Sequence, residues 1–99
     1  MVRVEFCDSD LDRLETDAEF LMGHSAAVVR AYRLRLQLLR SAKDERDLYS
    51  LKSLRFEKLK GQRQHQRSLR LNDQYRLIVE LQGTGADKSI LVVGVEDYH

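Results

Sequence analysis

The sequence predicts an α+β fold, in which two N-terminal helices pack on one face of a mostly antiparallel sheet of four to five strands. Three observations support this prediction. Apolar residues recur at helical spacing in two segments of the first half, and apolar and polar residues alternate in the second half. The segment 90–95 is apolar at consecutive positions, which is typical of a strand inside a sheet. Because the chain has no repeat and no linker, we expect one domain over residues 1–99.

The N-terminal segment predicts a short strand over residues 1–7, followed by a helix that ends at Gly23. Asp8 or Ser9 is expected to be the N-cap, and acidic residues crowd the first turns, where the helix dipole favours them. The expected apolar face of this helix consists of Leu11, Leu14, Ala18 and Leu21.

A second helix is predicted from about Ser25 to Ser41. Its apolar stripe is expected to consist of Val29, Tyr32, Leu36 and Leu39. Its polar face consists of Arg30, Arg33, Gln37 and Arg40. These polar residues either face solvent or offer a contact to acidic partners. Asp44 is then expected to cap a short helical turn.

A β-hairpin follows, and its register can be derived because directly opposed residues of an antiparallel pair point to the same side. A three-residue loop over residues 72–74 places Leu69 opposite Leu77, and its Asn and Asp residues favour a turn. The same register sets Arg70 opposite Arg76 on the other face. Since the helices cover the apolar face, the two arginines are expected on the open face, where either solvent or an anion relieves their repulsion.

Composition and charge narrow the class of protein. The chain is 42% hydrophobic and 33% charged, as expected for a globular domain. It has no secretory signal and no long apolar run, so we expect a cytoplasmic protein that does not contact membranes. The single Cys7 cannot form an internal disulfide and has no partners at zinc spacing, so we expect neither a metal nor another cofactor.

The charge is strongly polarised along the chain. Residues 1–23 contain two basic and seven acidic residues, whereas residues 52–76 contain eight basic and two acidic residues. The positive segment coincides with the predicted hairpin. Such a basic segment is typical of a protein that binds a phosphate backbone, although a solvated strand can also be basic.

Three motifs resemble the HigB branch of the RelE/ParE toxin superfamily, also called plasmid maintenance killer proteins. They are the segment 59–63 (LKGQR), the segment 68–76 (SLRLNDQYR) and the terminal Asp97, Tyr98 and His99. They occur in the order and at the intervals of that family, and the resemblance covers essentially the whole chain. The resemblance implies a RelE-like fold and the toxin of a type II toxin–antitoxin system.

The activity implied by this resemblance is that of an endoribonuclease that cuts messenger RNA in the ribosomal A site. In this family a ribose 2′-hydroxyl attacks the adjacent phosphate and a 5′-hydroxyl leaves, without a metal ion. The implied partners are the ribosome, the translated message and a helix-turn-helix antitoxin of the HigA type. Operator DNA is contacted only through that antitoxin.

The resemblance also implies roles for individual residues. Lys60 and Arg76 match positions that neutralise charge on the scissile phosphate. Tyr98 would stack on a base or polarise the nucleophile, and His99 would move a proton near neutral pH. The remaining RNA-binding assignments are Arg63, Arg67, Arg70 and Asp97, of which Asp97 either orients His99 or caps the last strand.

Two positions depart from the family pattern. Several relatives have a histidine where this chain has Glu57, so no acid–base role transfers to that position. Arg67 stands where relatives often have an aromatic residue, which removes a stacking platform; His65 nearby either substitutes for it or faces water. Two alternative functions of the same fold stay open, a gyrase-directed toxin of the ParE type and a non-catalytic protein that acts only as a corepressor with its antitoxin.

Overall fold

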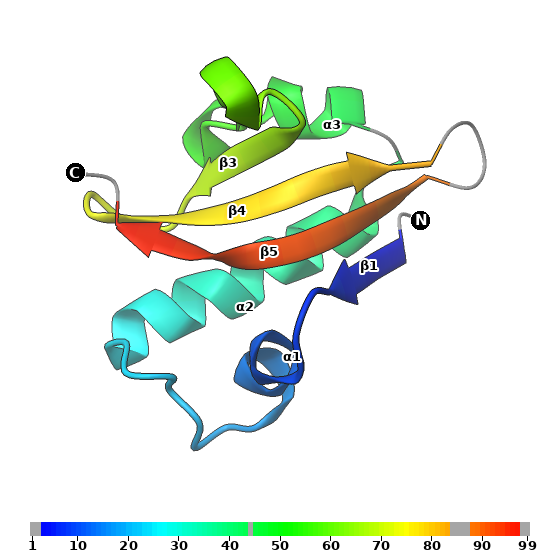
Figure 1. Ribbon diagram of the computed structural model, residues 1–99. Helices are drawn as coiled ribbons and strands as arrows, with labels where there is room; N and C mark the ends of the chain where they lie inside the picture. Colours follow the sequence, from blue (N-terminus) through cyan, green and yellow to red (C-terminus); the bar gives the residue numbers. More distant parts are fainter. Residues whose placement is uncertain (1–2, 44, 84–87, 98–99) are drawn as a thin grey trace.

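The structure, a computed structural model, describes residues 3–43, 45–83 and 88–97 and has the predicted α+β fold (Figure 1). The strands are β1 (Arg3–Phe6), β2 (Glu57–Lys58), β3 (Gln66–Arg70), β4 (Tyr75–Gln82) and β5 (Ser89–Asp97). The α-helices are α1 (Ser9–Thr16), α2 (Ala26–Ser41) and α3 (Glu45–Ser50), and two single 3₁₀ turns are η1 (Lys52–Leu54) and η2 (Gly61–Arg63). The predicted cap Asp44 lies outside the described residues.

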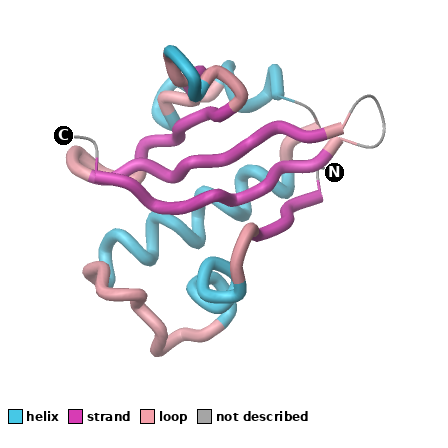
Figure 2. Tube along the Cα trace, viewed as in Figure 1, coloured by secondary structure: helices cyan, strands magenta, loops and turns pink. Residues whose placement is uncertain are grey.

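The five strands form one mixed sheet in the order β1-β5-β4-β3-β2 (Figure 2). All neighbouring pairs are antiparallel except β1 and β5, which are parallel. β5 therefore lies inside the sheet, as its apolar sequence predicts. Its residues on the core side, Ile90 and Val92, are fully buried. Leu91 and Val93, on the other side, are only half-buried.

The hairpin of β3 and β4 has the predicted register. Leu69 pairs with Leu77, and Arg70 pairs with Arg76. The loop closes because the Asn72 side-chain oxygen accepts hydrogen bonds from the backbone N–H groups of Gln74 and Tyr75, at 2.9 and 2.7 Å. The asparagine supplies these contacts from its own side chain, so the turn needs no glycine.

The first helix is shorter than predicted. Asp8 is the N-cap, and its carboxylate accepts the backbone N–H of Leu11 at 3.0 Å, but α1 ends at Thr16 instead of continuing to Gly23. Asp17 ends the helix because its backbone is extended and its carboxylate accepts the backbone N–H of Glu19 at 3.0 Å. The two later residues of the expected apolar face, Ala18 and Leu21, are consequently exposed.

The second helix follows the prediction closely. Ser25 caps α2 through the backbone N–H of Val28, and every residue of the predicted apolar stripe is buried. The polar face is not uniformly solvated, however. Arg33 donates to the carbonyl oxygens of Leu14 and Asp17, and Arg40 forms a bidentate pair with Glu15. These two arginines fasten the end of α1 to α2, which explains why they face α1 instead of solvent.

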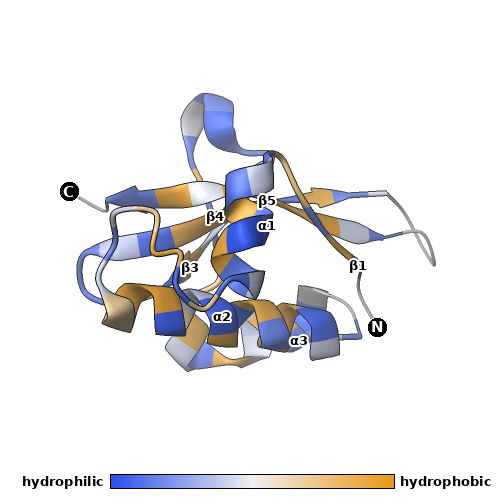
Figure 3. Ribbon diagram, turned by 90° about the horizontal axis from the view of Figure 1, so that it is seen from below, coloured by the Kyte–Doolittle hydropathy of each residue, from blue (hydrophilic) through white to orange (hydrophobic). Residues whose placement is uncertain are grey.

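A single hydrophobic core joins the helices to one face of the sheet (Figure 3). Its fully buried residues include Leu11, Tyr32, Leu36, Leu48, Leu69 and Leu77. Each such side chain contributes roughly 1.5–3 kcal/mol relative to an exposed position. Within the described part of the chain, no helix is long and apolar enough to span a membrane. The opposite face of the sheet carries the polar residues of β3, β4 and β5.

Candidate functional site

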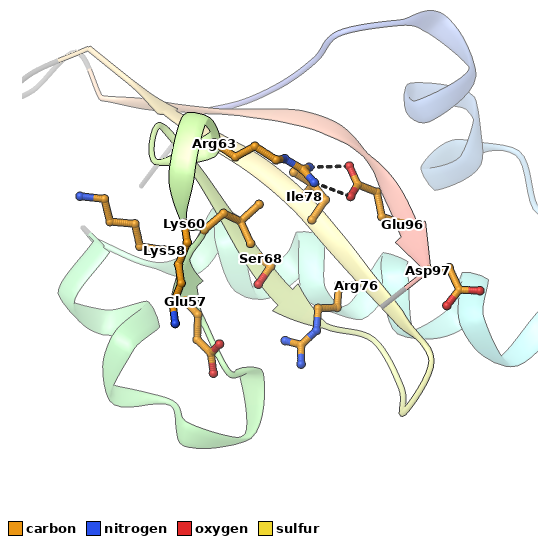
Figure 4. A pocket seen from close by; sticks show the side chains of 10 residues that line it. Glu57, Lys58, Lys60, Arg63, Ser68, Arg76, Ile78, Glu96 and Asp97 are labelled. Carbon is orange, nitrogen blue, oxygen red and sulfur yellow. Dashed lines mark hydrogen bonds and ion pairs between the residues drawn. The ribbon is translucent and has the colours of Figure 1, made fainter. Parts of the chain in front are cut away.

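A hollow of about 310 Å³ opens on this opposite face of the sheet (Figure 4). The residues that line it are Glu57, Lys58, Leu59, Lys60, Arg63, Ser68, Arg76, Ile78, Glu96 and Asp97. They come from β2, the η2 turn and the strands β3, β4 and β5. The hollow therefore depends on sheet pairing between segments that are far apart in sequence.

Lys60 reaches the hollow because the chain turns sharply after β2. β2 pairs with β3 through Glu57 and Ser68, and the backbone N–H of Leu59 donates to Gln66 at 3.2 Å. Lys60 then precedes the η2 turn, which Gly61 enters at a φ of 69°. Only glycine adopts this left-handed conformation readily, so Gly61 allows the chain to turn at this point. The motif glycine after the lysine thus has a local structural reason.

Arg76 forms part of the floor of the hollow. It lies on β4 with 8% of its surface exposed, directly opposite Arg70 on β3 and directly opposite Glu96 on β5. The sequence predicts an arginine on the open face, and the structure places it there, but more deeply buried than an open face suggests. The reason is that residues 57–63 rise beside this part of the sheet and form a wall of the hollow.

The side chain of Arg63 crosses the hollow from the η2 turn to β5. Its two terminal nitrogens donate to the Glu96 carboxylate at 2.9 and 2.6 Å, and its Nε donates to the Gln66 side-chain oxygen at 2.8 Å. Figure 4 shows the Arg63 side chain passing over Ile78 to reach Glu96. The hydrogen bonds to Glu96 raise the pKa of Arg63 above its ordinary value. Gln66 in turn donates to Glu80 at 3.1 Å, which fixes the orientation of its amide.

Two other predicted RNA-binding residues do not line the hollow. Arg70 pairs with Asp73 in the hairpin loop. Arg67 faces the helix side of the sheet edge, where its Nε donates to the hydroxyl of Tyr49 at 3.1 Å. The Asp73 carboxylate therefore offsets part of the repulsion expected between Arg70 and Arg76.

Asp97 is the last described residue and is held at the end of β5. It pairs with Tyr75 on β4, and its carboxylate accepts a hydrogen bond from the Gln74 side chain at 3.1 Å. Asp97 therefore lies beside the hairpin loop, at the edge of the hollow. Tyr98 and His99, the two predicted acid–base residues, lie outside the described residues.

Ile78 and Glu96 line the hollow beside the predicted cations, and the sequence motifs did not single them out. Glu57 lines it too, at the position to which the family resemblance transfers no acid–base role, and so does Ser68, the first residue of the second motif. The one available signal for Glu96 is that two acidic residues end an otherwise apolar strand. That signal gains meaning only when the register of β4 and β5 sets Glu96 opposite Arg76.

The hollow combines groups that suit work on a phosphodiester. Lys60 and Arg76 supply two positive charges within one recess, and such groups stabilise negative charge that develops on phosphate oxygens. Glu57 adds a carboxylate, and carboxylates act as general bases. His65 is not among the residues that line it; its Nε2 lies 3.6 Å from Glu80, and its side chain is 60% exposed.

Two solved structures share the fold of this chain. It superposes with a TM-score of 0.61 on a YoeB/ParE toxin from Agrobacterium tumefaciens, at 18% identity over 99% of this chain and 100% of the other. It also superposes with a TM-score of 0.56 on a conserved hypothetical protein from Helicobacter pylori, at 14% identity over 99% and 96% of the two chains. A comparison with curated protein sequences finds no significant match.

The family itself is shown by sequence. Residues 4–99 match the family model of HigB-like toxins, described as the RelE-like toxin of the type II toxin–antitoxin system HigB. The chain therefore belongs to the HigB-like toxin family, and this membership implies an antitoxin partner.

Proposed function

We propose that this HigB-like toxin is a ribosome-dependent endoribonuclease that cuts messenger RNA in the A site. The observation that carries the proposal is the convergence of Lys60 and the buried Arg76 on one hollow of the sheet. A cleft with two cations and nearby carboxylates fits a single scissile phosphate better than it fits a broad, sequence-independent contact with duplex nucleic acid.

The proposed reaction needs no metal ion. The ribose 2′-oxygen forms a bond to the adjacent phosphorus as its proton passes to a general base, and the bond from phosphorus to the 5′-oxygen breaks as that oxygen receives a proton. Lys60 and Arg76 stabilise the charge that accumulates on the pentavalent phosphate. His99 and Tyr98 are the proposed acid–base pair, and Glu57 is a further candidate because its carboxylate lines the same hollow.

The proposed partners follow from the family and the reaction. The antitoxin would be a helix-turn-helix protein of the HigA type, which would also link the toxin to operator DNA. The ribosome would present the message to the hollow, and the site of action would be the cytoplasm. Arg70 and Arg67, which lie outside the hollow, are proposed to contact RNA beyond the scissile phosphate.

The test compares the wild type with Lys60→Ala, Arg76→Ala and His99→Ala under inducible expression, with breaks in translated messages mapped by sequencing. Lys60→Ala and Arg76→Ala are each expected to lower cleavage by about 10²- to 10³-fold, as loss of one electrostatic donor typically does. His99→Ala is expected to lower cleavage by about 10²- to 10⁴-fold, as loss of a general acid or base does. Lys52→Ala is the matched control, because Lys52 is an exposed lysine that does not line the hollow.

Two measurements keep the test interpretable. Thermal unfolding of each purified variant separates loss of the site from loss of the fold, which matters most for the buried Arg76. Growth arrest that survives all three substitutions would contradict the site assignment. Damaged DNA with intact messages would instead favour a gyrase-directed toxin.

A further inference from the structure

The η2 turn that carries Lys60 has almost no hydrophobic anchorage. Residues 60–65 are all exposed, and η2 contains no buried residue. The turn is joined to the sheet where the backbone N–H of Leu59, before the turn, donates to the carbonyl oxygen of Gln66, after it. Beyond this bond, β2 pairs with β3 over only two residues. Within residues 3–43, 45–83 and 88–97, no hydrogen bond or ion pair holds the Lys60 ammonium group. The direction of this lysine therefore depends on how the backbone of the η2 turn is held.

The Arg63 side chain is the strongest link from this turn to the rest of the sheet. It reaches Gln66 on β3 and Glu96 on β5, so it spans the strand between them, β4. Two parallel N–H···O bonds to one carboxylate fix both the distance and the plane of the guanidinium group. Gln66 is only 9% exposed and is itself held by Glu80, so it offers Arg63 a fixed acceptor.

This arrangement leaves Arg63 poorly suited to bind RNA. Its Nε and both terminal nitrogens already donate to protein acceptors. A phosphate could take Arg63 only by displacing Glu96, whose carboxylate would then remain beside the incoming anion. Displacement of this kind opposes binding, because it brings two negative charges together.

We propose that Arg63 is a positioning residue, which acts with Glu96 and Gln66 as a brace that holds the η2 turn and aims Lys60 into the hollow. This inference deepens the proposed function and rests on it. It assigns Glu96, a residue that the sequence motifs do not mark, to the reaction. Misplacement of a catalytic group by about 1 Å can lower a rate by as much as about 10²-fold, so a brace of this kind has a measurable effect.

A double-mutant cycle tests the brace, with Arg63→Gln, Glu96→Gln and the double variant compared on translating ribosomes. If the brace exists, each single change breaks it completely. All three variants should then lose turnover by the same factor, about 10- to 100-fold, with little change in KM. Gln66→Leu, which removes the neutral acceptor of Nε together with the hydrogen bond from Gln66 to Glu80, should cause a smaller loss of the same kind. Glu5→Gln is the matched control, because Glu5 forms an exposed ion pair with Arg3 on the distant strand β1.

Other outcomes overturn the proposal. A loss in Arg63→Gln with a raised KM and no effect of Glu96→Gln would mean that Arg63 contacts RNA directly. A gain of activity in Glu96→Gln would mean that Glu96 restrains the site. Additive losses in the double variant would mean that the two residues act independently.

A second readout does not depend on cleavage. Amide hydrogen exchange at positions 59 and 63, whose N–H groups donate to the carbonyl oxygens of Gln66 and Lys60, should become faster in Arg63→Gln and in Glu96→Gln, because the turn loses its tie to β5. Unchanged exchange would refute the brace even if activity falls. If the wild type fails to cleave messages while exchange rises as expected, the proposed function fails and the brace stands as a structural feature.

Discussion

The buried hydroxyl group of Tyr32 is expected to stabilise the folded protein in a pH-dependent way. Its side chain is fully buried between α1 and the sheet, and its hydroxyl donates to the carbonyl oxygen of Leu11 at 2.7 Å. Burial, followed by the nearby carboxylates of Glu15, Asp12 and Asp8, raises the pKa of Tyr32. The substitution Tyr32→Phe removes the hydroxyl and leaves the ring in place.

The expected loss of stability in Tyr32→Phe follows from the lost hydrogen bond, and its pH dependence follows from the raised pKa of Tyr32. Near neutral pH the substitution should lower the free energy of unfolding by about 1 kcal/mol, or the melting temperature by about 4–8 °C for a domain of this size. A tyrosine whose pKa is raised in the folded state contributes stability that is complete below the unfolded pKa of about 10. Above that pH, the unfolded wild type ionises first, and its stability falls by about 1.4 kcal/mol per pH unit relative to the phenylalanine variant.

The assay is urea unfolding of wild type and Tyr32→Phe at several pH values. The difference in unfolding free energy should stay near 1 kcal/mol from about pH 7 to 9 and approach zero near pH 11. Other tyrosines and lysines titrate in both proteins, so their effects cancel in the difference. A difference that is constant across this range would refute the inference that Tyr32 stays buried and neutral.

Three further substitutions test the fold and the approach to the site. Asp17→Asn removes a carboxylate, and the pKa of this group is lowered by the backbone N–H of Glu19 and then by Arg13. Any stability advantage of the wild type over this variant should therefore be present at neutral pH and disappear as the pH falls below about 4, as measured by thermal unfolding. Gly61→Ala should cost about 1 kcal/mol in urea unfolding and reduce message cleavage, because alanine is strained at a φ of 69° in the turn that carries Lys60. Leu36→Ala should cost about 2–5 kcal/mol in the same assay, because it empties a fully buried position.

Matched controls exist for the last two substitutions. Gly94→Ala places a Cβ in open space on β5, beside the register shift of that strand and without the left-handed backbone, and should be milder than Gly61→Ala. Leu34 lies on the same helix as Leu36 but is 48% exposed, so Leu34→Ala should stay within about 0.5 kcal/mol of wild type. Equal effects within either pair would contradict the role assigned to backbone strain or to burial. For Asp17→Asn, a stability difference that persists at low pH would contradict the electrostatic explanation.

The hairpin shows how far local pattern can predict structure. A strand has a side-chain period of two, so counting loop residues was enough to set Leu69 against Leu77 and Arg70 against Arg76. The first helix shows where pattern misleads. Ala18 and Leu21 continue the helical spacing, but Asp17 bonds its own local backbone and ends the helix before them.

The candidate site was only partly visible from sequence. The motifs singled out Lys60, Arg63 and Arg76, and the structure brings all three to one hollow. The same reasoning grouped Arg63 with Arg70 and Arg67 as basic residues, because a charge in a sequence carries no information about its partner. The three arginines prove to contact Glu96, Asp73 and Tyr49 respectively.

The α+β class, the second helix and the hairpin register followed from residue order, because each depends on periodicity or on a turn only a few residues long. The shape and chemistry of the hollow did not, because they require β5 to pair with β4 and the η2 turn to fold against the same face. That pairing brings Glu96 to Arg63 across 33 positions of the chain, and it decides which cations are held by the protein itself. Tertiary packing, through contacts that no local pattern encodes, thus turned a basic stretch of sequence into a site with a defined geometry.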